Sequence, residues 1–243
     1  MASKTKSSPK YKRILLKLSG EAMMGKENFG IDPDFIFYLA EEIKSAYKTG
    51  VEVAIVVGGG NIFRGVAGSK QGIDRTTADY MGMLATIFNG MALQDAIERI
   101  GVATRLQTAF EIKEIAEPFI RKRAIRHLEK GRIVIAGGGT GLPFITTDTA
   151  AAMRALEINC EAIFKGTGVD GVYDKDPRKN NNVKKFDTLS LEEAFRCDDI
   201  NIMDNSAIDL CRANKINVVV FDIYKKGNLK KAVLGQKVGT LIK

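Results

Sequence analysis

Two stretches of sequence are the most informative about the architecture of this chain: V-E-V-A-I-V-V-G-G-G at residues 51–60 and R-I-V-I-A-G-G-G at residues 132–139. Each is a run of β-branched and apolar residues, typical of a buried strand, that ends in three consecutive glycines. Glycine leaves the backbone N–H groups bare, and bare N–H groups bind anions. Polar residues follow both triplets, N-I-F-R-G after the first and T-G-L-P-F-I-T-T-D after the second. The pattern predicts a sheet edge that binds two phosphate-bearing groups.

Strand-like and helix-like patterns alternate along the rest of the chain. Further strand-like runs lie at 12–18, 102–107, 161–165 and 217–221. Apolar residues at three- and four-residue spacing predict helices over 33–49, 74–100, 117–130, 147–157 and 204–214. This alternation predicts an α/β fold, a three-layer αβα sandwich around a mostly parallel open sheet. Ligands bind such sheets beyond the carboxyl ends of the strands, where both glycine triplets lie.

The composition narrows the class of protein. The chain has 243 residues, of which 45% are hydrophobic, and its formal net charge is +8. That charge favours anionic ligands. Residues 1–12 carry much of the excess and are expected to form a disordered basic arm before a single domain over 13–243. No apolar stretch follows the arm, so neither a signal peptide nor a membrane anchor is expected.

Cysteine and histidine usage argues against several kinds of site. Cys160, Cys197 and Cys211 are widely spaced and outside any C-x-x-C motif. Neither a disulfide framework nor a thiolate metal site is therefore expected, and the protein is predicted to be cytoplasmic. His127 falls in a charged helical segment and is expected to be exposed to solvent. No Ser/His, Cys/His or histidine-based metal site is predicted.

Two phosphate-binding motifs are matched only in part. The segment G-E-A-M-M-G-K-E at 20–27 resembles a P-loop, but Glu27 stands where Ser or Thr must reach magnesium. The segment G-T-G-V-D-G at 166–171 fits G-x-G-x-x-G, but V-Y-D-K-D-P follows it instead of a helix. Neither a P-loop nor a Rossmann turn is predicted.

Lysines stand at the ends of two predicted strands. Lys17 lies within I-L-L-K-L, just before Ser19 and Gly20, and Lys165 ends the run E-A-I-F-K. A single lysine in such a position usually extends to solvent. Two such lysines beside two glycine turns favour instead a site in which both lysine side chains point at bound phosphates. Asp148 and Asp204 each begin a predicted helix and also fit the role of N-cap.

Five segments carry a family resemblance: K-L-S-G-E-A at 17–22, G-G-G-N-I-F-R-G at 58–65, A-D-Y-M-G-M-L-A-T at 78–86, G-T-G-L-P-F-I-T-T-D-T-A-A at 139–151 and V-D-G-V-Y-D-K-D-P at 169–177. In this order and spacing the chain resembles, over essentially its whole length, the bacterial uridylate kinases of the amino-acid-kinase fold family. The related carbamate, acetylglutamate, glutamate and aspartate kinases should lack R-G after the first triplet and the A-D-Y-M-G-M segment.

The resemblance implies phosphoryl transfer from ATP to UMP, giving ADP and UDP, with Mg²⁺ accompanying ATP. It implies four catalytic residues, Lys17, Lys165, Asp148 and Arg64, with Asp148 between the two lysines. The phosphate of UMP is already anionic, so the transfer needs positive charge rather than a general base. The resemblance also implies a UMP-binding lobe to about residue 160 and an ATP-binding lobe from about residue 161.

The same resemblance assigns the binding residues. Those for ATP are Lys17, Leu18, Ser19, Gly20, Gly60, Arg64, Thr167, Tyr173 and Asp176. Those for UMP are Gly59, Asp79, Thr140, Gly141, Leu142, Pro143, Phe144, Ile145, Thr146 and Thr147, with Asp79 on the ribose hydroxyls. No metal ligand among the side chains is implied. Gly168 stands where some relatives have a lysine, so one charged contact to ATP is missing.

Regulation and assembly are also implied by resemblance. A segment that matches a region linked to GTP activation comprises Gly25, Lys26, Glu27, Asn28, Phe29 and Gly30. The resemblance further implies UTP as an inhibitor and a homohexamer as the assembly. The apolar stretch at 81–93 would suit a subunit interface, although a core helix would look the same.

Two other functions stay open. Another kinase of this fold would act on a carboxylate or a carbamate. A nucleic-acid-binding protein would use the basic arm and R-K-R-A-I-R at 121–126. No RRM, KH or zinc-finger pattern supports that function, and aromatic residues are not interleaved with the basic runs. Neither nucleic acid nor a membrane is expected as a partner.

Overall fold

A computed structural model describes residues 8–65, 72–175, 177, 179–180, 182–196 and 202–243. Its main sheet is built from the strands β1 (Arg13–Leu18), β2 (Glu52–Val57), β3 (Thr104–Thr108), β4 (Glu117–Pro118), β5 (Ile133–Gly137), β6 (Ala162–Thr167), β9 (Thr188–Leu189), β10 (Asn217–Asp222) and β11 (Gly239–Ile242). A separate antiparallel hairpin joins β7 (Val172–Tyr173) to β8 (Lys185–Phe186).

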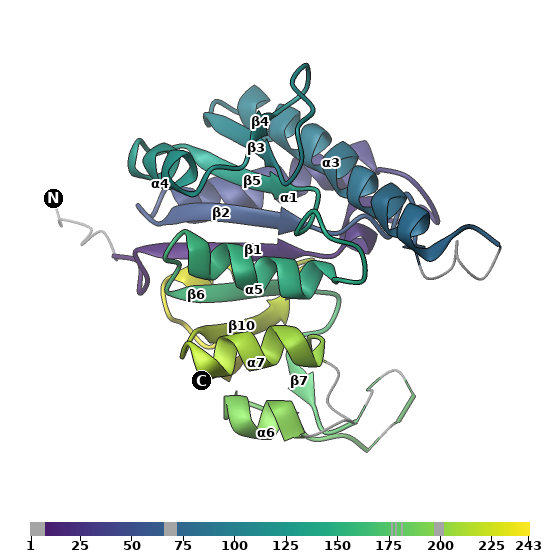
Figure 1. Cartoon of the computed structure of the whole chain (residues 1–243). Helices are drawn as coiled ribbons and strands as arrows, with labels where there is room; N and C mark the ends of the chain where they lie inside the picture. The colour runs from purple at the N-terminus through teal and green to yellow at the C-terminus, as the bar shows by residue number, and fades with distance from the viewer. Residues whose placement is uncertain (1–7, 66–71, 176, 178, 181, 197–201) are drawn as a thin grey trace, which may run out of the picture.

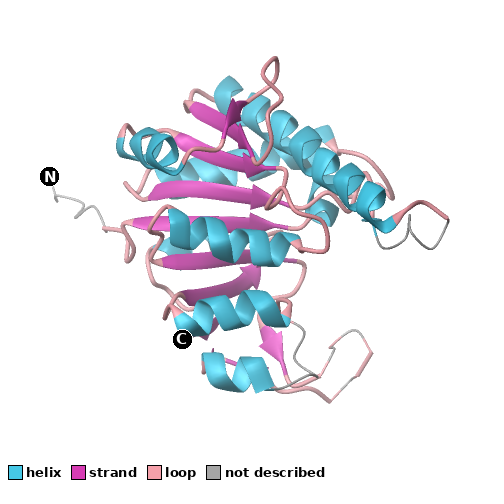
Figure 2. Ribbon diagram, in the orientation of Figure 1, coloured by secondary structure: helices cyan, strands magenta, loops and turns pink. Residues whose placement is uncertain are grey.

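Helices occupy both faces of the sheet. They are the 3₁₀ helix η1 (Gly20–Met24) and the α-helices α1 (Pro33–Tyr47), α3 (Arg75–Arg99), α4 (Arg121–Glu129), α5 (Thr147–Glu157), α6 (Leu191–Arg196), α7 (Asn205–Ala213) and α8 (Asn228–Val233). The sheet runs in the order β4-β3-β5-β2-β1-β6-β10-β11-β9. Its described neighbours are parallel apart from β10 and β11. Figures 1 and 2 show a helical layer on each side, which confirms the predicted αβα sandwich.

The two faces of the sheet build two separate cores. Along β1, Ile14, Leu16 and Leu18 belong to the core under α1, α3 and α8. Leu15 belongs to the core under α4, α5, α6 and α7. Because side chains alternate between faces, Lys17 shares the face of Leu15 and lies toward α5. The alternation of side chains along β1 therefore places Lys17 on the face of the sheet that α5 covers.

Most predicted helices are confirmed to within two residues, but the prediction over 117–130 is wrong at its start. Glu117 and Pro118 form β4, which pairs with β3 at the edge of the sheet. Proline lacks an N–H group and is tolerated in an edge strand. The helix α4 begins only at Arg121, after Ile120 in an extended conformation.

The expectation that His127 is exposed is also wrong. Ala124, His127 and Leu128 form the buried face of α4, at spacings of three and four residues. The Nε2 atom of His127 lies 3.0 Å from Glu117 Oε2, and its Nδ1 atom lies 3.0 Å from Arg132 Nη1. Burial raises the pKa of Glu117, but hydrogen bonds from Gln107 and His127 outweigh burial and hold it below its usual value. His127 is thus a buried member of a partly exposed polar cluster.

The chain is attached to the domain before residue 13. Lys10 N donates to Val233 O at 2.9 Å, and Lys12 N donates to Glu161 Oε2 at 2.8 Å. Tyr11 is buried and meets Phe164 edge to face. The expected arm over 1–12 is therefore too long at its carboxyl end, and its residues 1–7 lie outside the described part of the chain. Among the described helices, none is long and apolar enough to cross a membrane.

Candidate active site

The carboxyl ends of four neighbouring strands collect the polar residues singled out in the sequence. In the sheet, β5, β2, β1 and β6 are consecutive neighbours. The glycine triplets follow β2 and β5, while Lys17 of β1 is the register partner of Lys165 of β6. The structure therefore brings the two glycine turns and the two lysines to one edge.

The two lysines converge on one carboxylate. Lys17 Nζ lies 2.7 Å from Asp148 Oδ1, and Lys165 Nζ lies 3.0 Å from Asp148 Oδ2. Lys165 Nζ also donates to the carbonyl oxygen of Ile202. The helix cap is Thr146, whose Oγ1 accepts from Thr149 N, so the interpretation of Asp148 as the N-cap is wrong. Asp148 sits in the first turn of α5, where its side chain is free to hold both lysines.

Electrostatics shift the pKa values of two members of this trio. Burial raises the pKa of Asp148, but the ammonium groups of Lys17 and Lys165 outweigh burial, so its pKa lies below the usual value. Burial lowers the pKa of Lys165, repulsion from Lys17 lowers it further, and Asp148 offsets only part of the shift. The arrangement presents net positive charge at the sheet edge, which suits a polyanionic ligand.

Asp204 joins two helix termini beside this trio. Its Oδ1 atom accepts from Ala207 N at 3.0 Å, which confirms its predicted role as the N-cap of α7. The same atom accepts from Thr149 Oγ1 at 2.8 Å, and Oδ2 accepts from Thr146 Oγ1. Asp204 thereby fixes the amino end of α5, a contact that the local sequence pattern did not reveal.

The first glycine turn is packed tightly against α3. A Cβ atom on Gly59 would lie 2.7 Å from Ala85 Cβ and 2.7 Å from Gly82 O. Within the described residues, the N–H groups of Gly59 and Gly60 have no hydrogen-bond acceptor. Free N–H groups in a glycine turn form an anion-binding surface. Arg64 lies on this turn, where Nε donates to Gly60 O at 3.3 Å and the guanidinium pairs with Glu21 of η1.

A cavity of about 220 Å³ separates this turn from the second glycine loop. Its lining includes Gly59, Gly60, Phe63, Arg64, Gly65, Asp79, Gly82, Met83, Thr86, Gly139, Leu142, Ile145, Thr146 and Thr147. At the start of α5, the N–H groups of Thr147 and Asp148 have no acceptor among the described residues. A helix N-terminus of this kind favours a phosphate.

The segment 140–147 forms the outer wall of the cavity. Leu142 N donates to Thr140 Oγ1 at 3.2 Å, and Gly141 and Phe144 have φ angles of 82° and 65°. Asp79 of α3 reaches across the cavity and accepts from Phe144 N at 2.8 Å. Pro143 lies in the same turn, between the exposed side chains of Leu142 and Phe144.

Besides Gly60 and Arg64 of the first glycine turn, the residues assigned to ATP include some at the ends of β1 and β6. Ser19 follows Leu18 and caps η1, with its Oγ accepting from Ala22 N at 3.3 Å. Thr167 ends β6, where its Oγ1 donates to Val169 O at 2.8 Å. Tyr173 lies in β7 and donates to Asp170. Asp176 lies outside the described residues.

Tyr224 is a residue at this edge that the motifs did not indicate. A Cβ atom on Gly168 would lie 3.6 Å from its Cε2 atom. The ring of Tyr224 stacks on Phe35 of α1 with centroids 4.8 Å apart. Gly168, which has no side chain, therefore faces an aromatic ring at this edge.

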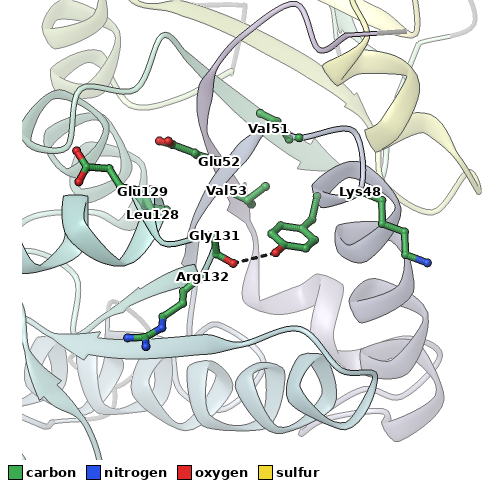
Figure 3. A pocket seen from close by; sticks show the side chains of 10 residues that line it. Lys48, Val51, Glu52, Val53, Leu128, Glu129, Gly131 and Arg132 are labelled. Atoms are coloured by element: carbon green, nitrogen blue, oxygen red, sulfur yellow. Dashed lines mark hydrogen bonds between the residues drawn. The ribbon is translucent and has the colours of Figure 1, made fainter. Parts of the chain in front are cut away.

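A larger hollow of about 400 Å³ lies at the opposite, amino-terminal edge of the sheet, beside Val51 and Val53 (Figure 3). Tyr47 donates to Gly131 O there at 2.9 Å. The charged side chains of Lys48, Glu129 and Arg132 point in different directions in Figure 3. Because the glycine turns and the lysine pair lie at the other edge, this hollow is not the candidate active site.

Known proteins share this architecture. Residues 12–222 match the model of the amino acid kinase family. The chain is similar to the UMP kinase of Bacillus anthracis, with 40% identity over 96% of both chains and a TM-score of 0.92. It is similar to the UMP kinase of Ureaplasma parvum, with 36% identity over 96% of this chain and 98% of that one and a TM-score of 0.89. The uridylate kinase of Archaeoglobus fulgidus is 29% identical over 95% of this chain and 99% of that one, with a TM-score of 0.74. With its lysine pair, glycine turns and three-layer fold, the chain belongs to the amino acid kinase family.

Proposed function

We propose that this protein transfers a phosphoryl group from ATP to UMP, giving ADP and UDP. The observation that carries the proposal is the pairing of Lys17 and Lys165 on Asp148 beside a cavity whose other wall holds Asp79. The UMP kinases of Bacillus anthracis and Ureaplasma parvum support UMP as the acceptor, because this chain matches them over nearly its whole length.

The acceptor enters the cavity in this mechanism. The free N–H groups of Gly59 and of the first turn of α5 bind the phosphate of UMP. Asp79 accepts hydrogen bonds from the ribose hydroxyls. The segment 140–147 encloses the base. UMP is thereby oriented with its phosphate toward the lysine pair.

The donor approaches from the ends of β1 and β6. Lys17 and Lys165 neutralise the charge that spreads over the transferred group, and Asp148 holds both ammonium groups in place. Arg64 leaves Glu21 to add a forked donor. The UMP phosphate attacks as an anion, so no proton has to be removed. Loss of one such cation typically lowers turnover by about 10² to 10³.

Mg²⁺ enters as part of the substrate, bound to the phosphates of ATP. Among the described residues, no group of three or more His, Cys, Asp or Glu side chains is placed to hold a metal ion. Asp148 is already engaged by two ammonium groups. A magnesium ion that keeps its waters and binds mainly through substrate phosphates fits these residues.

We further propose that the segment 25–30 responds to GTP, and that UTP inhibits by occupying the UMP cavity. An amide pair links the segment to the first glycine turn. Asn61 Nδ2 donates to Gly30 O at 2.8 Å, and Asn89 Nδ2 donates to Gly58 O at 2.7 Å. Asn61 and Asn89 also bond to each other, so a shift of Gly30 is transmitted to the turn that binds phosphate.

The assembly that we propose is a homohexamer held in part through α3. Apolar side chains on one side of this helix are exposed to solvent: Tyr80, Met81, Leu84, Phe88 and Met91. An exposed apolar stripe of this kind marks an interaction surface. We place the enzyme in the cytoplasm, since the described cysteines, Cys160 and Cys211, are free thiols.

The acceptor is tested by measuring ADP formation from ATP with UMP, CMP, acetylglutamate, glutamate or carbamate. Turnover with UMP is the expected result. Turnover with a carboxylate or carbamate and none with UMP would overturn the proposal in favour of another kinase of this fold.

Lys17→Met should abolish turnover, while calorimetry should show that UMP still binds. The matched control is Lys12→Met, an exposed lysine just before the opposite end of β1, which should behave as wild type.

A further inference from the structure

Asp79 is held in place by neighbours from two elements. Arg75, one helical turn earlier in α3, directs its Nε toward both carboxylate oxygens, at 3.0 Å from Oδ1 and 2.9 Å from Oδ2. Phe144 N donates to Oδ2 from the segment 140–147. The side chain of Asp79 is 16% exposed, so these bonds form in a partly desolvated place where they are stronger than in water.

Arg75 also contacts the segment 140–147 directly. Its guanidinium carbon lies 5.3 Å from the centre of the Phe144 ring, within range of a cation–π interaction. Phe144 has a φ of 65°, which is uncommon for a bulky residue and strains the backbone. The contacts to Asp79 and Arg75 offset that strain. Arg75 therefore connects α3 to the outer wall of the cavity at two points.

The carboxylate keeps capacity for a ligand. A carboxylate accepts about four hydrogen bonds, and the protein supplies Asp79 with three contacts of this kind. A ribose hydroxyl can therefore bind while Arg75 continues to fix the orientation of the group. Arg75 Nε bridges the two oxygens, so it orients the whole plane of the carboxylate.

We propose that Arg75 is a positioning residue for the nucleotide acceptor: it orients Asp79 toward the ribose and holds the turn at Phe144 over the cavity. This inference rests on the proposed function, because it presumes that the cavity binds UMP. The ligand chemistry that it serves is a nucleoside monophosphate with a free 2′-hydroxyl.

The same helix offers a matched control. Asp95 and Arg99 form another pair four residues apart, with Arg99 Nε 2.9 Å from Asp95 Oδ2. Both side chains are exposed at the far end of α3, and neither lines the cavity. If such a pair acts only by stabilising the helix, Arg75→Gln and Arg99→Gln should have similar effects.

The experiment compares Arg75→Gln, Arg75→Lys and Arg99→Gln with wild type in the full chain. Steady-state kinetics give kcat and separate KM values for UMP and ATP, and calorimetry gives the Kd values of UMP and 2′-deoxy-UMP. For Arg75→Gln we expect the KM for UMP to rise about tenfold, as for loss of a charged hydrogen-bond partner. The KM for ATP should change less than twofold. The preference for UMP over 2′-deoxy-UMP should fall, Arg75→Lys should restore part of it, and Arg99→Gln should match wild type.

Equal rises in both KM values, or an unchanged preference for the 2′-hydroxyl, would overturn the inference. If circular dichroism shows that Arg75→Gln does not fold, the inference is tested with Arg75→Lys and Phe144→Leu instead. Phe144→Leu keeps the backbone bond to Asp79 but removes the ring, and it should weaken UMP binding without affecting ATP. The inference fails if neither variant affects UMP selectively. Absence of UMP turnover in wild type is a separate result, which rejects the proposed function itself.

Discussion

The carboxylate of Asp148 compensates the charge of two buried ammonium groups in the folded protein. This carboxylate lies within 3.0 Å of both Lys17 Nζ and Lys165 Nζ, and all three side chains are largely withdrawn from water. A buried charge that loses its partner is strongly destabilising. The trio is therefore important for stability as well as for the proposed chemistry.

Replacing this carboxylate should destabilise the fold. We expect Asp148→Asn to lower the free energy of unfolding by about 3 kcal/mol at pH 7, measured by urea denaturation. Since the pKa of Asp148 is depressed in the folded state, its stabilising contribution is complete above the unfolded pKa and is lost as the pH falls through the folded value. The difference from wild type should thus be constant between pH 5 and 8 and shrink below about pH 4.

The control for this change removes one of the cations. Adding Lys165→Met to Asp148→Asn should recover part of the lost stability, because a single ammonium group then remains beside the amide. An unchanged urea midpoint in Asp148→Asn would contradict the assigned role of the carboxylate.

Lys165 should set an alkaline limit on activity. Burial and the neighbouring Lys17 hold its pKa below the ordinary lysine value of 10.5. The ammonium group therefore loses its proton at lower pH than a free lysine does, and kcat at saturating ATP and UMP should start to fall before the pH reaches 10.5. In Lys165→Arg the charge persists, so whatever activity remains should lack this decline. A wild-type profile that stays flat past pH 10.5, or the same decline in both proteins, would refute this.

The glycine turn after β2 depends on its close approach to α3. Gly59→Ala would place a methyl group 2.7 Å from Ala85 Cβ and from the backbone oxygen of Gly82, so the helix or the turn must shift. We expect a loss of about 1–3 kcal/mol in unfolding free energy. Gly60→Ala is the control, since its Cβ would lie 3.6 Å from the nearest atom, Arg64 Nε. Equal urea midpoints for the two variants would argue against a strict requirement at Gly59.

Local patterns predicted the elements well where one signal dominated. The helix α5 spans residues 147–157 as predicted, because Thr146 caps it and apolar residues line one face. The start of α4 was wrong because Pro118, with neighbours of helical spacing, lies in an edge strand. The strand β11 was not predicted, since its four residues, G-T-L-I, gain their pairing only from the distant strands β10 and β9.

The parts of the site that lie at the ends of strands could be predicted from the sequence. The glycine triplets and lysines are local features, so parallel strands bring them to one edge. The placement of Asp148 between the lysines came from the family resemblance. Arg75 and Glu21 were not singled out, because their contacts to Phe144 and Arg64 join segments distant in sequence. The burial of His127 had a signal, its spacing from Ala124 and Leu128, which the surrounding charges obscured.

Self-association should be governed by the exposed side of α3. Phe88 is 56% exposed in the middle of its apolar stripe, and burying this stripe in an interface would remove it from water. We expect wild type to be oligomeric by light scattering at micromolar concentration and Phe88→Glu to form smaller species. Phe37→Glu is the control, because Phe37 is 53% exposed on a different helix, α1. A monomeric wild type, or equal effects of both changes, would exclude this interface.

The register of the two central strands has a consequence for how the chain folds. Lys17 and Lys165 are direct partners in the ladder that joins β1 to β6, and like charges opposite each other oppose strand pairing. The helix α5 immediately precedes β6 and carries the neutralising carboxylate. We therefore expect pairing of β1 with β6, which unites the early and late strands of the sheet, to be stronger once α5 has docked and its carboxylate offsets the two ammonium charges. Docking of α5 and closure of the central ladder should then be coupled during folding, so that the strands that join the two halves of the chain and the lysine pair form together.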